Sequence, residues 1–138
     1  MPVRVVRLGS ARAPDEGVRL GTVRRPPRGV PKSEFGTRNY YDVWLPELAP
    51  SAALVSWALV EPWTDARWRR FERSYRKEMA TPGSRHLIAT LAALSVRSGF
   101  SVGCYCEDYA HCHRSVLAGL LIEAGALVDT PDGERGRG

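Results

Sequence analysis

The 138-residue chain is 43% hydrophobic, which fits one globular domain with its own core and excludes a disordered protein. Its formal net charge of +5 favours an anionic partner, and no stretch approaches the roughly 18 consecutive apolar residues of a membrane span. Three cysteines, an odd number, and arginines within the first ten residues argue against a secreted disulfide protein, so we expect a cytoplasmic one with no membrane partner.

The N-terminal third is predicted to hold two strands and a stiff loop. Residues 1–8 are rich in valine and end before Gly9, which is typical of a strand, and residues 18–23 form a weaker strand candidate. The run RRPPRGVPK follows at residues 24–32, and its three prolines exclude regular structure because proline lacks an amide donor. The segment 40–51 alternates roughly in polarity and is interrupted by prolines.

Three helices are predicted in the middle of the chain. Ser51 can cap a helix over residues 52–60, and Thr64 can cap a second that runs to about Met79. After a turn at residues 81–84, a third helix is expected from Ser84 to Arg97. Aromatic and apolar side chains at helical spacing predict the buried face of the second helix: Trp68, Phe71, Tyr75 and Met79.

The last third is predicted to contain a strand, a polar loop and a helix. The strand covers Phe100 to Cys106, the helix runs from about His113 to Ala124, and residues 127–128 form a final short strand. Residues 129–138 are polar and glycine-rich, so we expect a flexible tail there. The fold class is therefore α/β: one compact layered domain over residues 1–128, with a small sheet, packed helices and a strand-loop-helix site near the C-terminus.

The polar loop concentrates the chemically active residues of the chain. Residues 104–115 read CYCEDYAHCHRS and contain all three cysteines and two of the three histidines. The helix that follows presents unpaired amides at its N-terminus, where Arg114 and Ser115 also stand, so the junction predicts a pocket for a phosphate-type or nucleotide-type anion. The alternative is that Arg114 pairs with Glu107 or Asp108 and only braces the loop.

The same loop is a candidate thiol site. Cys112 lies near the predicted helix N-terminus beside two histidines and Arg114, a setting that favours the thiolate. Neither Cys106 nor Cys112 stands at the separation from Arg114 that the tyrosine phosphatase signature requires. We therefore keep Cys106 and Cys112 open as reactive residues, with His113 or His111 as acid or base near neutral pH.

A metal or redox sensor is the third possibility. Cys106 and Cys112, with His111 or His113, would be the ligands of a zinc or iron ion. Strand alternation places Cys104 on the same face as Cys106, where one of the two is expected to be buried and inert. No cofactor is predicted, because the cysteines do not form the separated pairs typical of structural zinc sites.

The hypothesis that joins both ends of the chain is a single anion site. Arg28 and Lys32 from the proline-rich loop would surround a small anionic ligand together with Arg114 and Ser115. The supporting groups that we expect to orient the ligand or the reactive thiol are Asp42, Glu107 and His111.

A non-catalytic nucleic-acid-binding module is the main rival to this site. Residues 1–38 carry nine lysines or arginines against three acidic residues, an excess that could attract a polyanion. Such a basic face would be built from arginines spread over the first half of the chain: Arg12, Arg19, Arg24, Arg25, Arg28, Arg67 and Arg70.

Three segments of the chain resemble a bacterial family. The run GCYCEDYAHCHRSVL, the stretch Arg28-Gly29-Val30 with Lys32, and the stretch from Asp42 to Ser51 are similar to motifs of the YeaO-like proteins, domain-of-unknown-function family 488. Pro26 and Pro27 stand where that family usually has a tryptophan, so the loop is expected to differ locally. The resemblance implies a compact α/β fold in the bacterial cytoplasm and implies no particular reaction.

Overall fold

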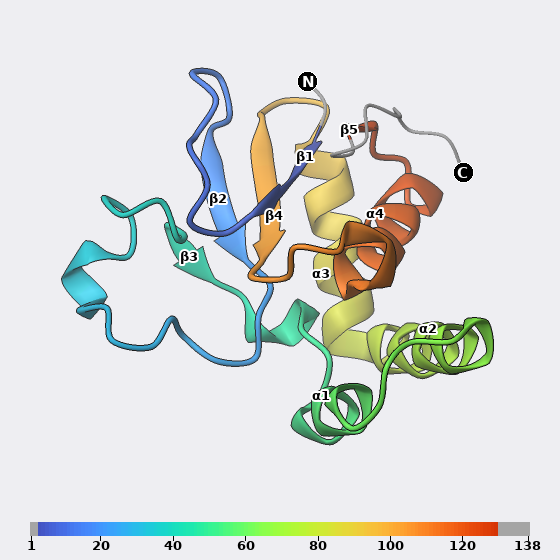
Figure 1. Ribbon diagram of the computed structural model, residues 1–138. Coiled ribbons are helices and arrows are strands. Elements are labelled where there is room, and N and C mark those ends of the chain that lie inside the picture. The colour runs from blue at the N-terminus through green and yellow to red at the C-terminus, as the bar shows by residue number, and fades with distance from the viewer. Residues whose placement is uncertain (1–2, 130–138) are drawn as a thin grey trace.

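A five-stranded parallel sheet forms the centre of the computed structural model, which describes residues 3–129 (Figure 1). The strand order is β3-β2-β4-β1-β5, so the late strand β4 lies between the two earliest ones and pairs with both. All five residues of β4 are buried, as is typical of a central parallel strand covered on both faces. The strand bounds are β1 Val3–Arg7, β2 Val18–Gly21, β3 Val43–Trp44, β4 Phe100–Cys104 and β5 Val128–Asp129.

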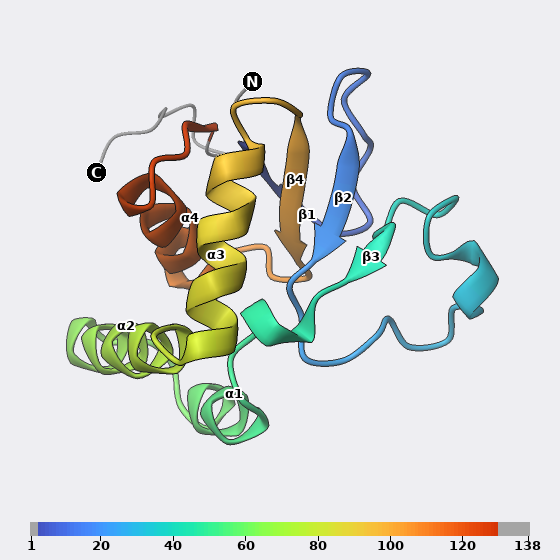
Figure 2. The same cartoon turned by 180° about the vertical axis from the view of Figure 1, so that it is seen from behind.

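Four helices gather on one side of the molecule, while the long segment between β2 and β3 extends away on the other (Figures 1 and 2). The expected caps are confirmed, because Ser51 Oγ accepts from the amide of Leu54 at 3.2 Å and Thr64 Oγ1 accepts from Arg67 at 3.1 Å. The helix bounds are α1 Ala52–Leu59, α2 Asp65–Met79, α3 Pro82–Leu94 and α4 His113–Glu123.

The α/β prediction is confirmed, and the boundaries differ in physically simple ways. Helix α3 begins at Pro82 and not at Ser84, because proline fits the first helical turn, where no amide donor is needed. Strand β4 ends at Cys104, so Cys106 belongs to the following loop. Strand β5 includes Asp129, which pairs with Arg4 of β1 and lies one residue beyond the predicted end of the domain. The rest of the predicted tail, residues 130–138, lies outside the described part.

Two apolar clusters divide the interior. The larger one joins the sheet to the helices and includes the predicted α2 face of Phe71, Tyr75 and Met79, with Trp68 partly buried beside it. The smaller cluster lies where strands β1, β2 and β4 end, and it contains two of the three cysteines. In the described part of the chain, no helix combines the length and the apolar character needed to cross a bilayer. Of the two apolar clusters, the smaller one is therefore the one that contains buried cysteines, Cys104 and Cys112.

Candidate functional site

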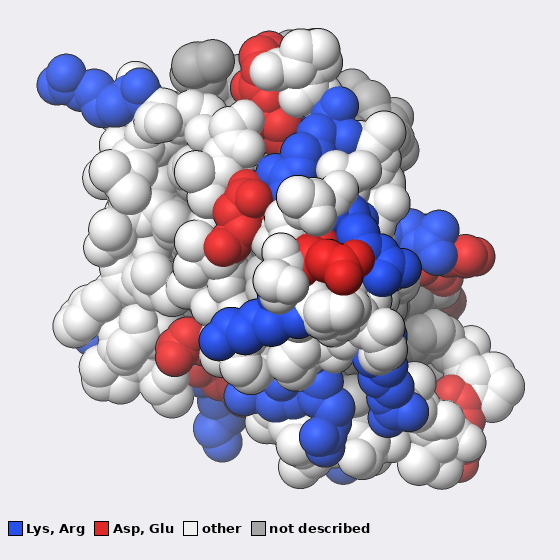
Figure 3. All heavy atoms as spheres, turned by 90° about the vertical axis from the view of Figure 1, so that its left-hand side faces the viewer, with Lys and Arg blue, Asp and Glu red and all other residues white. Residues whose placement is uncertain are grey.

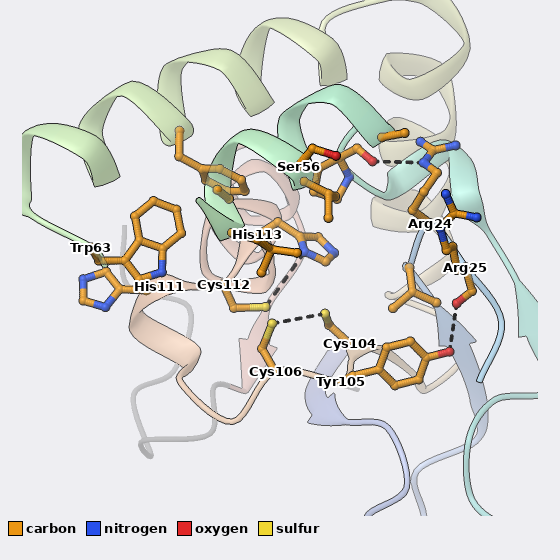
Figure 4. A pocket seen from close by; sticks show the side chains of 17 residues that line it. Arg24, Arg25, Ser56, Trp63, Cys104, Tyr105, Cys106, His111, Cys112 and His113 are labelled. Atoms are coloured by element: carbon orange, nitrogen blue, oxygen red, sulfur yellow. Dashed lines mark hydrogen bonds between the residues drawn. The ribbon is translucent and has the colours of Figure 1, made fainter. Parts of the chain in front are cut away.

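A cavity of about 440 Å³ opens at the C-terminal end of β4 (Figure 4). Its walls come from the residues that follow β2, from helix α1, from Trp63 and Phe71, and from the loop between β4 and α4. Ligand sites of parallel α/β proteins occupy this position, because loops there feed into helix N-termini. The cysteine-rich loop thus lies at the place in the fold where a ligand is expected.

Three cysteine sulfurs meet at one wall of this cavity. Cys104 ends β4, Cys106 lies two residues further on, and Cys112 is the N-cap residue of α4. The Sγ atoms lie within 4.8 Å of one another, and those of Cys104 and Cys106 are 3.8 Å apart. All three are free thiols, with Cys104 and Cys112 buried and Cys106 exposed.

Cys112 has the most electropositive surroundings of the three. His113 Nδ1 lies 3.9 Å from its sulfur, and the Nε–H of Arg114 donates to that sulfur at 3.4 Å. Cys112 also stands at the N-terminal end of α4, where unpaired amides give the helix a partial positive charge. These three influences all favour the thiolate of Cys112.

His113 is held in one orientation by the end of strand β2. Its Nε2 atom lies 2.6 Å from the backbone carbonyl of Thr22 and 3.4 Å from the Thr22 hydroxyl, and its ring packs against Tyr75. A carbonyl only accepts, so Nε2 carries the proton and donates. In the neutral ring Nδ1 is then the acceptor, and it is the nitrogen beside Cys112.

The Cys104 thiol donates to the sulfur of Cys106 at 3.8 Å, and both sulfurs lie within 4.8 Å of Cys112 Sγ. Hydrogen bonds from Cys104 and Cys106 lower the pKa of Cys112, and His113 lowers it further, which together outweigh the effect of burial. The pKa of Cys106 responds to opposing influences: the hydrogen bond from Cys104 lowers it, while hydrogen bonding with Cys112 and partial desolvation of its sulfur raise it to about 11. The surroundings of the three sulfurs therefore favour the thiolate at Cys112 over the other two positions.

Arg114 does not reach into the cavity. Its side chain is buried, its Nη2 donates to the backbone carbonyl of Cys106 at 2.7 Å, and its guanidinium lies 5.5 Å from the ring centre of Tyr109. The Nε–H is directed to Cys112, as described above. The arginine thus fastens the loop to the start of α4, which is the bracing role considered from the sequence, although through a carbonyl and a sulfur and not through an acid.

The acidic residues of the loop have other partners. Glu107 lies 3.1 Å from Arg7 at the surface, and Asp108 lies 2.8 Å from His111 Nδ1. The hydrogen bond from His111 lowers the pKa of Asp108. His111 stacks on Trp63 with ring centres 5.8 Å apart, and both side chains line the cavity. Of the supporting residues expected from the sequence, His111 is therefore the one at the cavity.

The other residues predicted for the anion site, three ligands and the supporting residue Asp42, do not line the cavity. Arg28 and Lys32 are exposed on the proline-rich loop, and neither lines the cavity. Ser115 Oγ donates to the carbonyl of Cys112 at 2.9 Å. Asp42 accepts two hydrogen bonds from Arg12, at 2.8 and 3.1 Å. Ser115 thus lies beside Cys112 with its hydroxyl bound to a backbone carbonyl, and the structure does not bring Arg28, Lys32 or Asp42 to the cavity.

Two arginines that the anion hypothesis had left out do line the cavity. Arg24 and Arg25 lie three and four residues after the end of β2, the strand beside β4. Arg24 donates to the carbonyls of Pro50, Pro46 and Ala49, whereas Arg25 is exposed. Sequence reasoning missed these two arginines because their position depends on the end of β2 lying beside the end of β4. That neighbourhood follows from the strand order, which the sequence does not display.

The candidate metal ligands also differ from expectation. Cys104 joins Cys106 and Cys112, and in the described residues no histidine nitrogen belongs to the group. Zinc bound to thiolates at about 2.3 Å separates tetrahedral sulfurs by about 3.8 Å, so the spacing of Cys104 and Cys106 suits zinc or iron. The three sulfurs are thus able to hold either an ion or a reactive thiolate.

The basic face expected for nucleic acid is reduced by ion pairing. Arg19 is fully buried and pairs with Glu16 at 2.7 Å, and Arg12 pairs with Asp42. Arg67 packs over the Trp57 ring at 4.1 Å. On the face that carries the proline-rich loop, basic side chains are spread from top to bottom, most densely in the lower half, and acidic side chains lie among them (Figure 3). The seven arginines therefore do not form one uninterrupted basic surface.

Comparison with known proteins agrees with the family resemblance. Residues 3–125 match the family DUF488-N3a, described as the active DUF488-N3 subclade. No curated protein and no solved structure matches the chain. The match covers nearly all of the described residues, including the cavity and the three cysteines. The chain belongs to the DUF488-N3a family, consistent with the resemblance to the YeaO-like proteins.

Proposed function

We propose that this protein is an enzyme in which the thiolate of Cys112 attacks an electrophilic carbon of a small anionic substrate held in the cavity. One observation carries the proposal: the Cys112 sulfur lies at the cavity wall between His113 Nδ1 and Arg114 Nε. A nucleophile beside a base that a third group orients is the general arrangement for nucleophilic catalysis. The description of the family as an active subclade supports a catalytic role.

The proposed reaction divides its steps among Cys112, His113 and the Thr22 carbonyl. His113 Nδ1 first takes the proton of the Cys112 thiol. The resulting thiolate forms the new sulfur–carbon bond while the leaving group departs with its bonding electrons and takes that proton from Nδ1. A water then displaces the sulfur, with His113 accepting the water's proton, and the Cys112 thiolate returns. The Thr22 carbonyl keeps Nδ1 directed at the sulfur throughout, because Nε2 stays bound to it.

Arg25 is the residue that we assign to the anionic group of the substrate. Arg24 already donates to three backbone carbonyls, while Arg25 is exposed at the cavity and has no ion-pair partner among the described residues. A cation beside a largely apolar wall suits a substrate with an apolar body and one phosphate or carboxylate group. Val55 and Phe71 contribute to that apolar wall.

Two alkylating agents that differ in charge test the proposal. Iodoacetate and iodoacetamide react with thiolates in the same way, but only iodoacetate carries a carboxylate for Arg25. We expect Cys112 to be alkylated first, with a higher iodoacetate-to-iodoacetamide rate ratio than free cysteine shows, as measured by intact mass and peptide mapping. Cys112→Ser should abolish this adduct, and Cys106→Ser should leave it in place.

Treating the protein with a chelator before alkylation distinguishes this function from metal binding. If the three sulfurs hold an ion in the purified protein, prior treatment with a strong chelator will expose Cys112 and accelerate its alkylation. We expect the alkylation rate to be unchanged by the chelator. First reaction at exposed Cys106, with Cys112 left unmodified, would contradict the proposed nucleophile.

A further inference from the structure

The three-sulfur cluster carries an inference about modification of the site. We propose that Cys106 is a resolving thiol, and that a hydroperoxide oxidises Cys112 and leads to a Cys106–Cys112 disulfide that switches the site off reversibly. The disulfide depends only on the reactivity and proximity of the two sulfurs. Its regulatory meaning rests on the proposed function, because the bond would consume the nucleophile.

The geometry selects Cys106 as the partner of Cys112. The three sulfurs lie within 4.8 Å of one another, so a small movement of one side chain brings two of them to bonding distance. Arg114 keeps the loop in place for this step, because it donates to the carbonyl of Cys106 and to the sulfur of Cys112. Cys106 is exposed and lies outside regular structure, so its side chain has room to move.

Cys104 is less suited to the same role. It is buried at the end of β4, where it is in register with Arg7 and its carbonyl accepts from the amide of Leu8 at 2.8 Å. A bond from Cys104 to Cys106 would close a ring through a single intervening residue, which strains disulfide geometry. The Cys104 thiol instead donates toward Cys106. We infer that Cys104 supports the cluster without forming the disulfide.

The chemistry balances with a hydroperoxide as oxidant. The Cys112 thiolate attacks one peroxide oxygen, so a sulfur–oxygen bond forms and the oxygen–oxygen bond breaks. The departing hydroxide becomes water by taking from His113 the proton that the Cys112 thiol had given up. The sulfur of Cys106 then attacks the sulfenic acid, so the disulfide forms and a second water leaves with the proton of Cys106. Two thiols lose two electrons and two protons, and hydrogen peroxide gains them.

Reduced full-length protein treated with a small excess of hydrogen peroxide tests the inference. Trypsin leaves all three cysteines in one peptide, since no lysine or arginine lies between Arg97 and Arg114. Cleavage after Glu107 separates Cys106 from Cys112, so a disulfide between them joins two peptides, while a Cys104–Cys106 bond stays within one. We expect the two-peptide product, reversible by a thiol reductant.

Two variants make the assignment specific. Cys106→Ser removes the resolving thiol at an exposed position, and we expect sulfinic acid on Cys112 to accumulate about tenfold faster than in the unmodified chain. Cys104→Ala is the matched control and should keep the Cys106–Cys112 disulfide. A Cys104–Cys106 disulfide, sulfinic acid on Cys112 at the same rate in both chains, or no oxidation at all would overturn the inference.

The outcome is separable from that of the proposed function. A Cys106–Cys112 disulfide in a protein whose Cys112 shows no preference for iodoacetate would retain the redox role and remove the assignment of an anionic substrate. Selective alkylation of Cys112 without any disulfide would do the reverse. The same preparation serves both measurements, so a folding defect would appear in both.

Discussion

His113 Nε2 lies 2.6 Å from the backbone carbonyl of Thr22, although the two residues are 91 positions apart in the chain. This contact ties the first residue of α4 to the end of β2 and fixes which ring nitrogen carries the proton. Because Nδ1 is then the acceptor beside Cys112, the hydrogen bond to a backbone atom sets the direction of proton transfer at the sulfur. The fold thus orients the base without an acidic partner.

Replacing His113 should slow reaction at Cys112. His113→Gln retains an amide donor for the Thr22 carbonyl but supplies no base or cation, so the thiolate fraction of Cys112 falls. We expect alkylation by iodoacetamide near neutral pH to slow by about tenfold or more, since one pKa unit is a factor of ten in thiolate. Thr22→Val keeps the carbonyl and is the control that should react at nearly the original rate.

Arg114 should matter for stability more than for anion binding. Arg114→Ala removes the buried donor to the Cys106 carbonyl and to the Cys112 sulfur, so we expect unfolding in urea to show a loss of about 2–4 kcal/mol. Arg114→Lys keeps the charge without the two-point contact. If sulfate raises the Tm of the unmodified protein but not of Arg114→Lys, the guanidinium binds the anion after all.

Arg25 should account for the preference for anionic reagents. Arg25→Ala removes an exposed cation at the cavity, so the iodoacetate-to-iodoacetamide rate ratio at Cys112 should fall by about threefold to tenfold at low salt and less at high salt. Arg28→Ala removes a neighbouring exposed cation that does not line the cavity. Equal falls in both variants would indicate a general surface potential and would leave Arg25 without a specific role.

The buried pair of Glu16 and Arg19 should make stability depend on pH. Burial raises the pKa of Glu16, but hydrogen bonds from Arg19 and Ser101 and the charge of Arg19 lower it by more, so the net pKa lies below that of the unfolded chain. A lowered pKa stabilises the fold above the unfolded value of about 4.3, and this stability is lost as the pH falls through the folded value.

A pair of acid-to-amide variants measures that contribution. Glu16→Gln leaves the buried Arg19 charge unpaired, so we expect a loss of about 3–5 kcal/mol near pH 7 and a flatter dependence of Tm on pH below about 5. Asp15→Asn removes an exposed carboxylate that pairs with Arg4, and it should cost less than about 1 kcal/mol. Equal effects of the two variants would contradict a special role for the buried pair.

The sequence by itself was sufficient for the local elements and for the neighbourhood of the site. Helix caps such as Ser51 and Thr64 act within a few residues, and strand and helix periods are local, so the α/β class and the cysteine-rich junction could be predicted. The family matched over residues 3–125 agrees with the motifs that were read from the sequence.

Only the tertiary structure decided what each side chain at the junction does. Strand order brings the end of β2 beside the end of β4, which places Arg24 and Arg25 at the cavity and gives His113 its carbonyl partner. Arg114 turns inward because a carbonyl and a sulfur lie within its reach. These choices depend on distances between atoms far apart in the chain, and periodicity and residue spacing carry no such distances.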